Sequence, residues 1–445
     1  MIRAIGPSML YRTLEWLATA GIQRWNSYQR VTCLFSAARL SQQPSTEMRL
    51  MCPHTNSGHH RKRVRSTSHF FSKPCHITCK KLGKSASILV AHVTIIRYPF
   101  IFTLPDGNLF IFANTQSIVY DYHKKEVVRR LPDIPGVPRS YPLTGGAMML
   151  PLDPENDYKV EILICGGSDR MDKNAVADNT CGRINLDDEE PEWEMETFVH
   201  KRLMPDGVFL ADGTVLWVNG CQRGWAGKNS KVIVFFFFCK LKEVIIGYNN
   251  RNHDPTFDPL IYDHEKPAGK RWTQGLANTD IARMYHSVAL TIPDGRVWIA
   301  GSNNNNPANV TAEYPTEFRV EYFSPPYLFK SKTRPLVSHV PRVATYGENI
   351  KVLVNFGDLA LPGSEPEIKV GLLRPGFSTH SMHMSQRYVV LRHSVSNDFQ
   401  SLTIEVPPTA NIFPPGSGYL FILCNGIPSK GTEIFVEHDV NDLMI

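Results

Sequence analysis

The sequence lacks an apolar run long enough to cross a bilayer as a helix, so no membrane span is expected. Its most apolar stretch, residues 232–239, is far too short for that purpose. A convincing secretory signal peptide is also lacking, because Arg12 and Glu15 interrupt the apolar part of residues 10–22. An amphipathic, Arg-rich and acid-poor start is typical of organelle transit peptides as well, and this alternative stays open.

Acidic residues are scarce in residues 1–95, where 14 Lys and Arg stand against only Glu15 and Glu47. This segment therefore carries a net charge of +12, and the remainder carries −6 because the whole chain is +6. Basic segments can contact nucleic acid, but no aromatic platform accompanies this one, so no nucleic-acid partner is expected. We expect residues 1–95 to be an unassigned or disordered basic segment, including the cluster at residues 59–65.

Cysteine and histidine residues in the same basic segment suggest a zinc site. They are Cys52, His54, His59, His60, Cys75, His76 and Cys79. Their spacing does not match the patterns of closed Cys/His sites, so zinc is the less favoured alternative there.

Glycine and proline are plentiful, with 30 and 32 residues, and favour turns between short strands over long helices. An Asp-Gly turn leads into an apolar strand three times, at residues 104–113, 210–220 and 292–301. Another apolar strand ends at Gly166 and Gly167. Repeated Asp-Gly turns before strands that end in small residues are typical of propeller blades. A generic β-sandwich with similar turns is the alternative.

A different pattern begins after Pro335. Short alternating or apolar segments follow at residues 349–354, 368–373, 388–391, 402–406 and 419–424. Their spacing favours an immunoglobulin-like sandwich of about a hundred residues.

A phenol and an imidazole stand side by side in residues 283–287, Arg-Met-Tyr-His-Ser, shortly before the third Asp-Gly turn. Adjacent residues of a strand point to opposite faces, so Tyr285 and His286 can meet one metal ion only where the backbone twists at a strand end. A second imidazole, His380, lies in residues 374–381, Arg-Pro-Gly-Phe-Ser-Thr-His-Ser. Taken alone, a Tyr-His pair is more often structural, because imidazoles are readily satisfied in β cores.

These motifs resemble the glyoxal oxidase branch of the galactose-oxidase-like copper radical oxidases. The resemblance is carried by residues 281–306, 314–321, 323–328 and 379–381, and it extends from about Tyr98 to the end of the chain. It implies an all-β chain in which an incomplete kelch-type β-propeller, residues 96–332, precedes a C-terminal early-set immunoglobulin-like β-sandwich, residues 333–445. Residues 96–332 have room for roughly five repeats of about 50 residues, whereas the resemblance implies a seven-bladed propeller.

The resemblance also implies a site for one copper ion. Tyr285 is expected to be the axial ligand and proton acceptor, and His286 and His380 the imidazole ligands, a donor set that suits Cu(II). The family has a second tyrosine, joined to a cysteine by a thioether, that stores a radical. Nothing before Tyr98 matches this Tyr-Cys radical cofactor. His383 is a competing ligand candidate, although we expect it to face solvent.

The implied reaction oxidises an aldehyde to a carboxylic acid and reduces O₂ to hydrogen peroxide. The expected partners are therefore a small aldehyde substrate and O₂, and the protein is expected to be extracellular and monomeric. The alternative hypothesis is a catalytically inactive, truncated relative that serves as a binding or structural propeller protein, because the Tyr-Cys pair is not located.

Two features bear on export. Cys165 and Cys181 flank a polar loop, so they form either a disulfide, if the chain is secreted, or two free buried thiols. Residues 309–311, Asn-Val-Thr, form a glycosylation sequon.

The resemblance is interrupted near residues 228–250. We interpret this stretch as an insertion, and its run of apolar residues has strong β-aggregation character.

Overall fold

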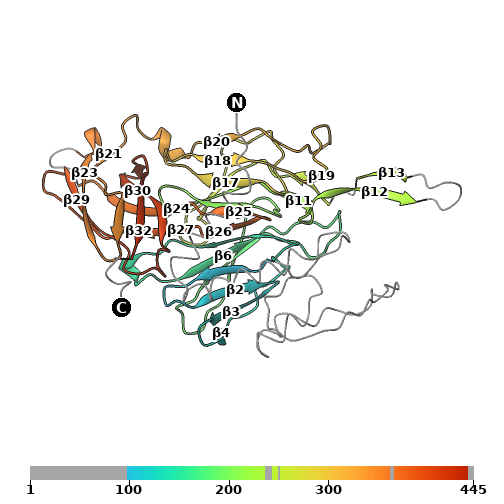
Figure 1. Ribbon diagram of the computed structural model, residues 1–445, viewed down its shortest axis with the longest axis horizontal. Helices are drawn as coiled ribbons and strands as arrows, with labels where there is room; N and C mark the ends of the chain where they lie inside the picture. Colours follow the sequence, from blue (N-terminus) through green and yellow to red (C-terminus); the bar gives the residue numbers. More distant parts are fainter. Residues whose placement is uncertain (1–97, 236–242, 249–250, 361–364, 439–445) are drawn as a thin grey trace, which may run out of the picture. The chain divides into compact units, whose positions relative to one another are not determined.

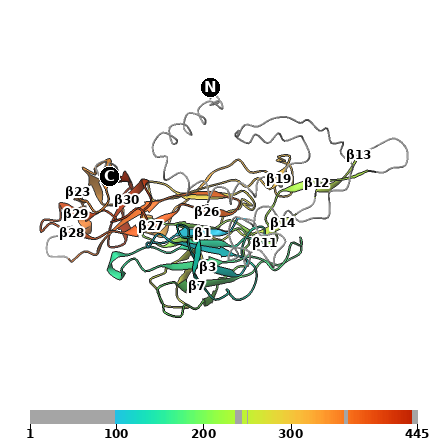
Figure 2. The ribbon, with the colours of Figure 1, turned by 60° about the horizontal axis from the view of Figure 1, so that its bottom comes forward.

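The computed structural model describes residues 98–235, 243–248, 251–360 and 365–438 (Figures 1 and 2). In these ranges the chain forms strands, turns and the short 3-10 helices η2 (Pro154–Asn156), η3 (Pro326–Phe329) and η4 (Gly357–Leu359). The prediction of an all-β fold is confirmed. No helix in these ranges is long and apolar enough to cross a membrane.

The basic segment, residues 1–95, lies outside the described residues, and so do the zinc candidates and the cluster at residues 59–65. Those interpretations stay predictions. The described residues belong to one compact unit, so its sheets have defined positions relative to one another.

Two four-stranded antiparallel sheets come first along the chain, with strand orders β1-β2-β3-β4 and β5-β6-β7-β8. Their strands are β1 (Phe100–Thr103), β2 (Leu109–Ala113), β3 (Gln116–Asp121), β4 (Glu126–Arg130), β5 (Gly146–Met149), β6 (Glu161–Cys165), β7 (Thr180–Asn185) and β8 (Glu194–Thr197). Strands that pair with their neighbours in sequence order form meanders, the kind of sheet from which propeller blades are built.

Two further sheets follow, with orders β16-β15-β10-β9 and β17-β18-β20. Their strands are β9 (Asp206–Phe209), β10 (Val215–Val218), β15 (Leu260–Tyr262), β16 (Trp272–Thr273), β17 (Val288–Thr291), β18 (Val297–Ala300) and β20 (Glu321–Phe323). We call these four sheets the blade sheets. Strands β9, β10 and β15 are buried along their whole length, as expected for inner strands that other sheets cover.

The predicted Asp-Gly turns lie in the blade sheets as short connections between strands. Gly107, Gly213 and Gly295 have φ of 87°, 84° and 88°, a region that favours glycine. In the third turn, Asp294 Oδ1 accepts a hydrogen bond from the Arg296 amide at 2.9 Å. Local turn chemistry therefore determines where the following apolar strand begins.

The stretch that interrupts the resemblance contains a hairpin. Strand β12 (Asn229–Phe235) pairs antiparallel with β13 (Glu243–Tyr248) and parallel with β19 (Asn305–Asn306). Next to it, β11 (Cys221–Gly224) pairs with β14 (Asn252–Pro255). Residues 236–242 and 249–250 lie outside the described residues, and the interpretation of 228–250 as an insertion stays a prediction.

The C-terminal residues form the sandwich, with sheet orders β21-β23-β29-β28 and β22-β32-β30-β24-β27. Its strands are β21 (Leu336–Ser338), β22 (Val343–Thr345), β23 (Asn349–Asn355), β24 (Ile368–Arg374), β27 (Arg387–Val390), β28 (His393–Val395), β29 (Ser401–Glu405), β30 (Gly416–Cys424), β31 (Ile427–Pro428) and β32 (Thr432–Glu437). Burial alternates strictly along β23, so one face of its sheet covers a core. Four of the five segments predicted for this region coincide with strands to within one residue, and the fifth, residues 419–424, lies within β30, which begins three residues earlier.

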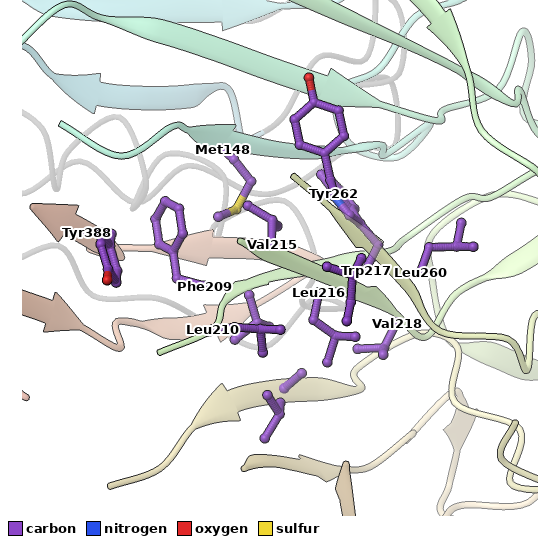
Figure 3. Packing of buried hydrophobic residues seen from close by; sticks show 14 of the residues in the cluster. Met148, Phe209, Leu210, Val215, Leu216, Trp217, Val218, Leu260, Tyr262 and Tyr388 are labelled. Carbon is purple, nitrogen blue, oxygen red and sulfur yellow. The ribbon is translucent and has the colours of Figure 1, made fainter. Parts of the chain in front are cut away.

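One buried apolar cluster joins the blade sheets to the sandwich (Figure 3). Trp217 of β10 and Phe209 of β9 belong to it, as does Tyr388 of β27. The rings of Phe209 and Tyr388 lie 5.7 Å apart, and the Tyr388 hydroxyl donates a hydrogen bond to Ala211 O at 3.1 Å. These contacts fix β27 against β9 and so position the chain segment between β24 and β27.

Cys165 and Cys181 lie opposite each other on β6 and β7 and form a disulfide. The alternative of two free thiols is therefore wrong. Cys221 and Cys424 are free and buried among the described residues.

Candidate metal centre

His380 lies at the tip of a hairpin that the sandwich extends toward the blade sheets. The hairpin consists of β25 (Phe377–Thr379) and β26 (Met382–Met384), which pair from Phe377–Met384 to Thr379–Met382 (Figure 1). His380 and Ser381 form the two-residue loop, with φ of 53° and 62°. Positive φ at both loop positions defines the hairpin turn that matches the twist of its strands, and non-glycine residues are strained there.

Tyr285 and His286 lie in the turn that precedes β17 of the blade sheets. His286 has φ of 62°, so the backbone reverses there and both rings reach the same side, stacked with centroids 4.0 Å apart. The turn is possible because Gly301 packs against it. A Cβ at Gly301 would lie 2.5 Å from the carbonyl oxygen of His286. The backbone twist that Tyr285 and His286 need in order to face one metal ion is therefore present.

The structure brings the three predicted ligands together. The ring centroids of His286 and His380 are 5.3 Å apart, and those of Tyr285 and His380 are 6.4 Å apart. Residues separated by about a hundred positions, in a turn of the blade sheets and in a hairpin that extends from the sandwich, thus lie close together.

Two more tyrosines, which were not predicted as site residues, lie against the same rings. The Tyr141 hydroxyl lies 3.1 Å from the Tyr285 hydroxyl, and its ring packs edge-on against His380 at 6.0 Å. The Tyr98 ring stacks on His380 at 4.7 Å and meets the Tyr141 ring at 5.1 Å. Both tyrosines are buried. The site is therefore lined by three phenols and two imidazoles.

A repeated sequence signal could have identified Tyr141. Arg139 and Arg283 each precede their tyrosine by two residues, and both side chains are buried. The Arg139 guanidinium donates to Gly166 O at 2.7 Å, and that of Arg283 donates to Gly301 O. Each arginine thus ties a tyrosine-bearing turn to the glycine that closes a following strand.

A buried carboxylate links the loop of His286 to the hairpin of His380. Asp206 Oδ1 accepts from the Ser378 hydroxyl at 3.1 Å, in the hairpin of His380. Its Oδ2 accepts from Asn219 Nδ2 at 2.8 Å and, at 3.5 Å, from the hydroxyl of Ser287, which follows His286. Burial raises the pKa of Asp206 to about 6, against the opposing effect of these hydrogen bonds.

Burial also determines the protonation of the candidate ligands. It lowers the pKa of His286 to about 4, assisted by repulsion from His380 and Lys228. It raises the pKa of Tyr285, as does the neighbouring phenol of Tyr141. At neutral pH, His286 is thus an uncharged imidazole with a lone pair, the form that binds metals.

The prediction that His383 faces solvent is wrong. Its Nε2 lies 2.8 Å from Pro375 O and its Nδ1 3.2 Å from Gly207 O, and burial lowers its pKa to about 4. Gly207 O also accepts from Gln386 Nε2 at 3.0 Å, so we assign the single N–H of neutral His383 to Nε2. Residues of a hairpin alternate between its two faces, and His383 lies on the face that is turned toward Gly207. Its hydrogen bond to Pro375 O supports the hairpin that carries His380.

The donors fit copper. Within the described ranges no cluster of three or more His, Cys, Asp or Glu side chains could hold a metal, so a metal at this place relies on phenol oxygens beside the imidazoles. Mixed nitrogen and oxygen donors of this kind suit Cu(II). Among the described residues no thioether-linked tyrosine is located: the thiols of Cys221 and Cys424 lie against Arg223 O and Leu359 O, and the cysteines outside the disulfide that remain lie beyond the described ranges.

Comparison with known proteins identifies the family. The family described as Glyoxal oxidase N-terminus matches residues 92–235 and 242–327, more than half of the chain. The chain belongs to the glyoxal oxidase family. Its match to that family skips residues 236–241, inside the stretch predicted to be an insertion. The galactose oxidase-like early set domain matches residues 334–436, which confirms the predicted nature of the sandwich.

Two curated relatives of this glyoxal oxidase family member are named aldehyde oxidases. It is 34% identical over 357 residues to aldehyde oxidase GLOX1 of Arabidopsis thaliana, covering 76% of this chain and 54% of the relative. It is 36% identical over 344 residues to aldehyde oxidase GLOX of Vitis pseudoreticulata, covering 75% of this chain and 60% of the relative. The chain thus spans little more than half the length of these relatives.

A solved structure supports the fold. A fungal alcohol oxidase of the AA5 family, determined in complex with copper, superposes with a TM-score of 0.52. The match covers 77% of this chain and 76% of that one at 17% identity.

Proposed function

We propose that this protein is a copper radical oxidase that oxidises small aldehydes to carboxylic acids and reduces O₂ to hydrogen peroxide. The observation that carries the proposal is the convergence of the Tyr285, His286 and His380 rings in a glyoxal oxidase family member. The names of its curated relatives, aldehyde oxidases, favour an aldehyde as the substrate.

The proposed reaction balances with the hydrated aldehyde. RCH(OH)₂ and O₂ give RCOOH and H₂O₂, so two electrons and two protons leave the substrate and both pairs pass to O₂. When bound, copper supplies a one-electron acceptor, and a protein radical supplies the second oxidising equivalent.

The residues of the chain would hold the metal and move one proton. His286 and His380 would be its imidazole ligands. Tyr285 would lose its hydroxyl proton when it binds the metal, and its phenolate oxygen would then accept the hydroxyl proton of the hydrated aldehyde. The buried setting of Tyr285 excludes bulk water from that transfer, since only 3% of the residue is exposed.

We further propose an extracellular location. The disulfide between Cys165 and Cys181 supports an oxidising compartment, because such bonds are rare in the cytosol. The glycosylation sequon at residues 309–311 would be accessible for modification, since Asn309 is partly exposed and Val310 is 64% exposed.

The test measures oxygen uptake and peroxide release by the purified, copper-loaded chain with glyoxal and methylglyoxal. We expect equal amounts of O₂ consumed and peroxide formed, a dependence on copper, and loss of both in His380→Ala. His393→Ala is the matched control, because His393 lies in β28 of the sandwich and its Nδ1 contacts Leu391 O. A folded, copper-bound protein that releases no peroxide would support the inactive, truncated relative instead.

A further inference from the structure

A strongly cationic cavity lies between the third Asp-Gly turn and the connection from the blade sheets to the sandwich. Its volume is about 690 Å³, and its charged lining residues are Asp294, Arg296, Lys330, Lys332 and Arg334. The lining thus has four cations and one carboxylate, a net charge of +3. We call this site the cationic cavity, and the copper chemistry proposed above uses none of its residues.

The connection between the two domains concentrates charge at this site. Every second residue from Lys330 to Arg334 is a cation, and all three cations line the cationic cavity. Lys330 and Lys332 are exposed, so their ammonium groups can contact a ligand that arrives from solvent. Exposed lysines alone are common on protein surfaces, so the evidence for a ligand has to come from the other walls.

Arg334 provides a positive charge that is fixed in place. Its guanidinium donates to Pro428 O at 2.7 Å, to Asp294 O at 2.7 Å and to Ser429 O at 2.6 Å. These bonds to neutral carbonyls use three of its five N–H groups and compensate none of its charge. A cation that is already held in position loses little conformational entropy when an anion binds.

The one carboxylate of the cationic cavity is occupied by its own neighbour. Asp294 Oδ2 accepts from Arg296 Nε at 2.7 Å and lies 2.6 Å from Arg296 Nη2. This pair neutralises Asp294 within the wall. An anion in the cavity therefore meets the charges of Lys330, Lys332 and Arg334 without a competing carboxylate.

Exposed aromatic rings border the same surface. Phe329 lines the cationic cavity and is 77% exposed. It also lines a neighbouring cavity of about 630 Å³, together with Tyr322 and Phe257. The guanidinium of Arg296 lies 4.6 Å from the centre of the Tyr322 ring, so cations and aromatic rings adjoin where the two cavities meet. Two adjoining cavities of this kind fit an extended molecule better than a single small anion.

We propose that this surface binds an acidic polysaccharide, a chain of uronic acid residues. Its carboxylates contact the lysines and Arg334, and its sugar rings pack on Phe329 and Tyr322. A sugar ring has an apolar C–H face that suits an aromatic ring, and each uronic acid adds a carboxylate at a regular interval. An acidic peptide supplies carboxylates without such faces. The binding does not depend on copper, and only the choice of an extracellular polymer rests on the proposed location.

The experiment measures binding of oligogalacturonate, an oligomer of uronic acid, to the full-length chain by titration calorimetry at several salt concentrations. One comparison ligand is its methyl ester, which keeps the sugar rings and loses the charge. The other is oligoglutamate, which keeps the carboxylates and has no sugar rings. We expect oligogalacturonate to bind more tightly than both and to bind more weakly as salt rises, because salt screens exposed charges.

The first variant is Lys330→Gln/Lys332→Gln. It should weaken binding of the oligomer by at least about tenfold and make it less sensitive to salt, because two charged contacts are lost. Lys124→Gln/Lys125→Gln is the matched control, since it removes the same charge from exposed lysines between β3 and β4 that line neither cavity. Equal losses in the two variants would mean that the oligomer responds only to net charge, and the proposal would be overturned.

The second variant is Phe329→Ser. It should weaken binding by about fivefold and leave the salt dependence unchanged, because it removes a ring and no charge. Phe318→Ser is its control, since Phe318 is 76% exposed and lines neither cavity. Circular dichroism confirms that all variants are folded.

Three results contradict the proposal: no binding of oligogalacturonate to the wild-type chain, equal binding of its methyl ester, or equal binding of oligoglutamate. The last result would identify an acidic peptide as the partner. Copper loading should leave the affinity for the oligomer unchanged. The binding result is therefore separate from the outcome of the peroxide assay, and either can fail alone.

Discussion

The two imidazoles of the candidate site are held by loops of different construction. The loop of His286 packs closely on main chain: Gly301 lies against the carbonyl of His286, and the amide of Asn303 donates to Tyr285 O at 3.0 Å. The loop of His380 is joined to the blade sheets by a shorter side-chain contact with Asp206, 3.1 Å from Ser378, than the 3.5 Å contact that Asp206 makes with Ser287. An atom added at the close contact of Gly301 with main chain causes a steric clash, whereas a substitution of Asp206 removes only hydrogen bonds. We therefore expect the two kinds of substitution to lower stability by different amounts.

The largest effect should come from Gly301→Ala, which attacks the main-chain brace. The added Cβ would lie 2.5 Å from His286 O and 3.0 Å from Ser287 Cα, and Gly301 has φ of 78°. Steric overlap and the strained backbone together should lower the free energy of unfolding by about 4 kcal/mol and abolish copper binding. Chemical denaturation and copper titration measure the two effects.

Gly347→Ala is the matched control for that variant. Gly347 has φ of 73°, and no atom lies within 4 Å of a Cβ added there. The stability that Gly347→Ala loses therefore comes from the backbone conformation alone, without a steric clash. Equal losses in both variants would show that close packing against His286 contributes nothing.

The next effect is expected for Asp206→Asn, which changes the carboxylate that links the two loops. The difference in unfolding free energy between this variant and wild type should depend on pH. The pKa of Asp206 is raised to about 6, while an unfolded aspartate titrates near 3.9. Between these values the folded state binds more protons, so ionisation of Asp206 lowers stability as the pH rises from about 4 to about 6. The variant lacks this loss, so its stability relative to wild type should rise by about 3 kcal/mol over that interval and stay constant above it.

Denaturation curves of both proteins between pH 4 and 8 give the difference. Because other groups titrate alike in the two proteins, their contributions cancel. A difference that does not change with pH would contradict the buried position of the Asp206 carboxyl.

The sequence predicted those parts of the molecule whose chemistry is local. The Asp-Gly turns and the strands after them depend on a few neighbouring residues, and they lie where expected. Tyr285, His286 and His380 were predicted from motifs, and their rings do meet. Their role as ligands stays a prediction.

The rest of the site depends on contacts that no single motif contains. Tyr141 meets Tyr285 across 144 positions of the chain, and Asp206 meets Ser378 across 172. His383 was misassigned because the inward face of a short hairpin cannot be told from its outward face without knowing what covers it. Only the recurrence of arginine two residues before a tyrosine could have indicated Tyr141.

A smaller effect is expected under the hairpin of His380. His383→Leu removes the donor to Pro375 O, whereas Gly207 O keeps its hydrogen bond from Gln386. One buried carbonyl without a partner should cost about 1.5 kcal/mol of stability and weaken copper binding modestly. His383→Gln, which can donate to the same oxygen, should recover part of the stability. Equal losses in both variants would mean that the hydrogen bond is unimportant and that shape alone supports the hairpin.

The smallest effect should be a gain, from Ser381→Gly at the tip of the same hairpin. Ser381 has φ of 62°, where glycine is favoured over serine, so relief of strain should raise stability by about 1 kcal/mol. Ser338→Gly in β21, outside the positive-φ positions, should lose a similar amount because glycine weakens a strand. If Ser381→Gly is stabilised and also binds copper more weakly, the strained turn orients His380 for the metal. If it is stabilised with unchanged affinity, the turn's shape alone suffices, and the side-chain brace through Asp206 sets the position of the imidazole.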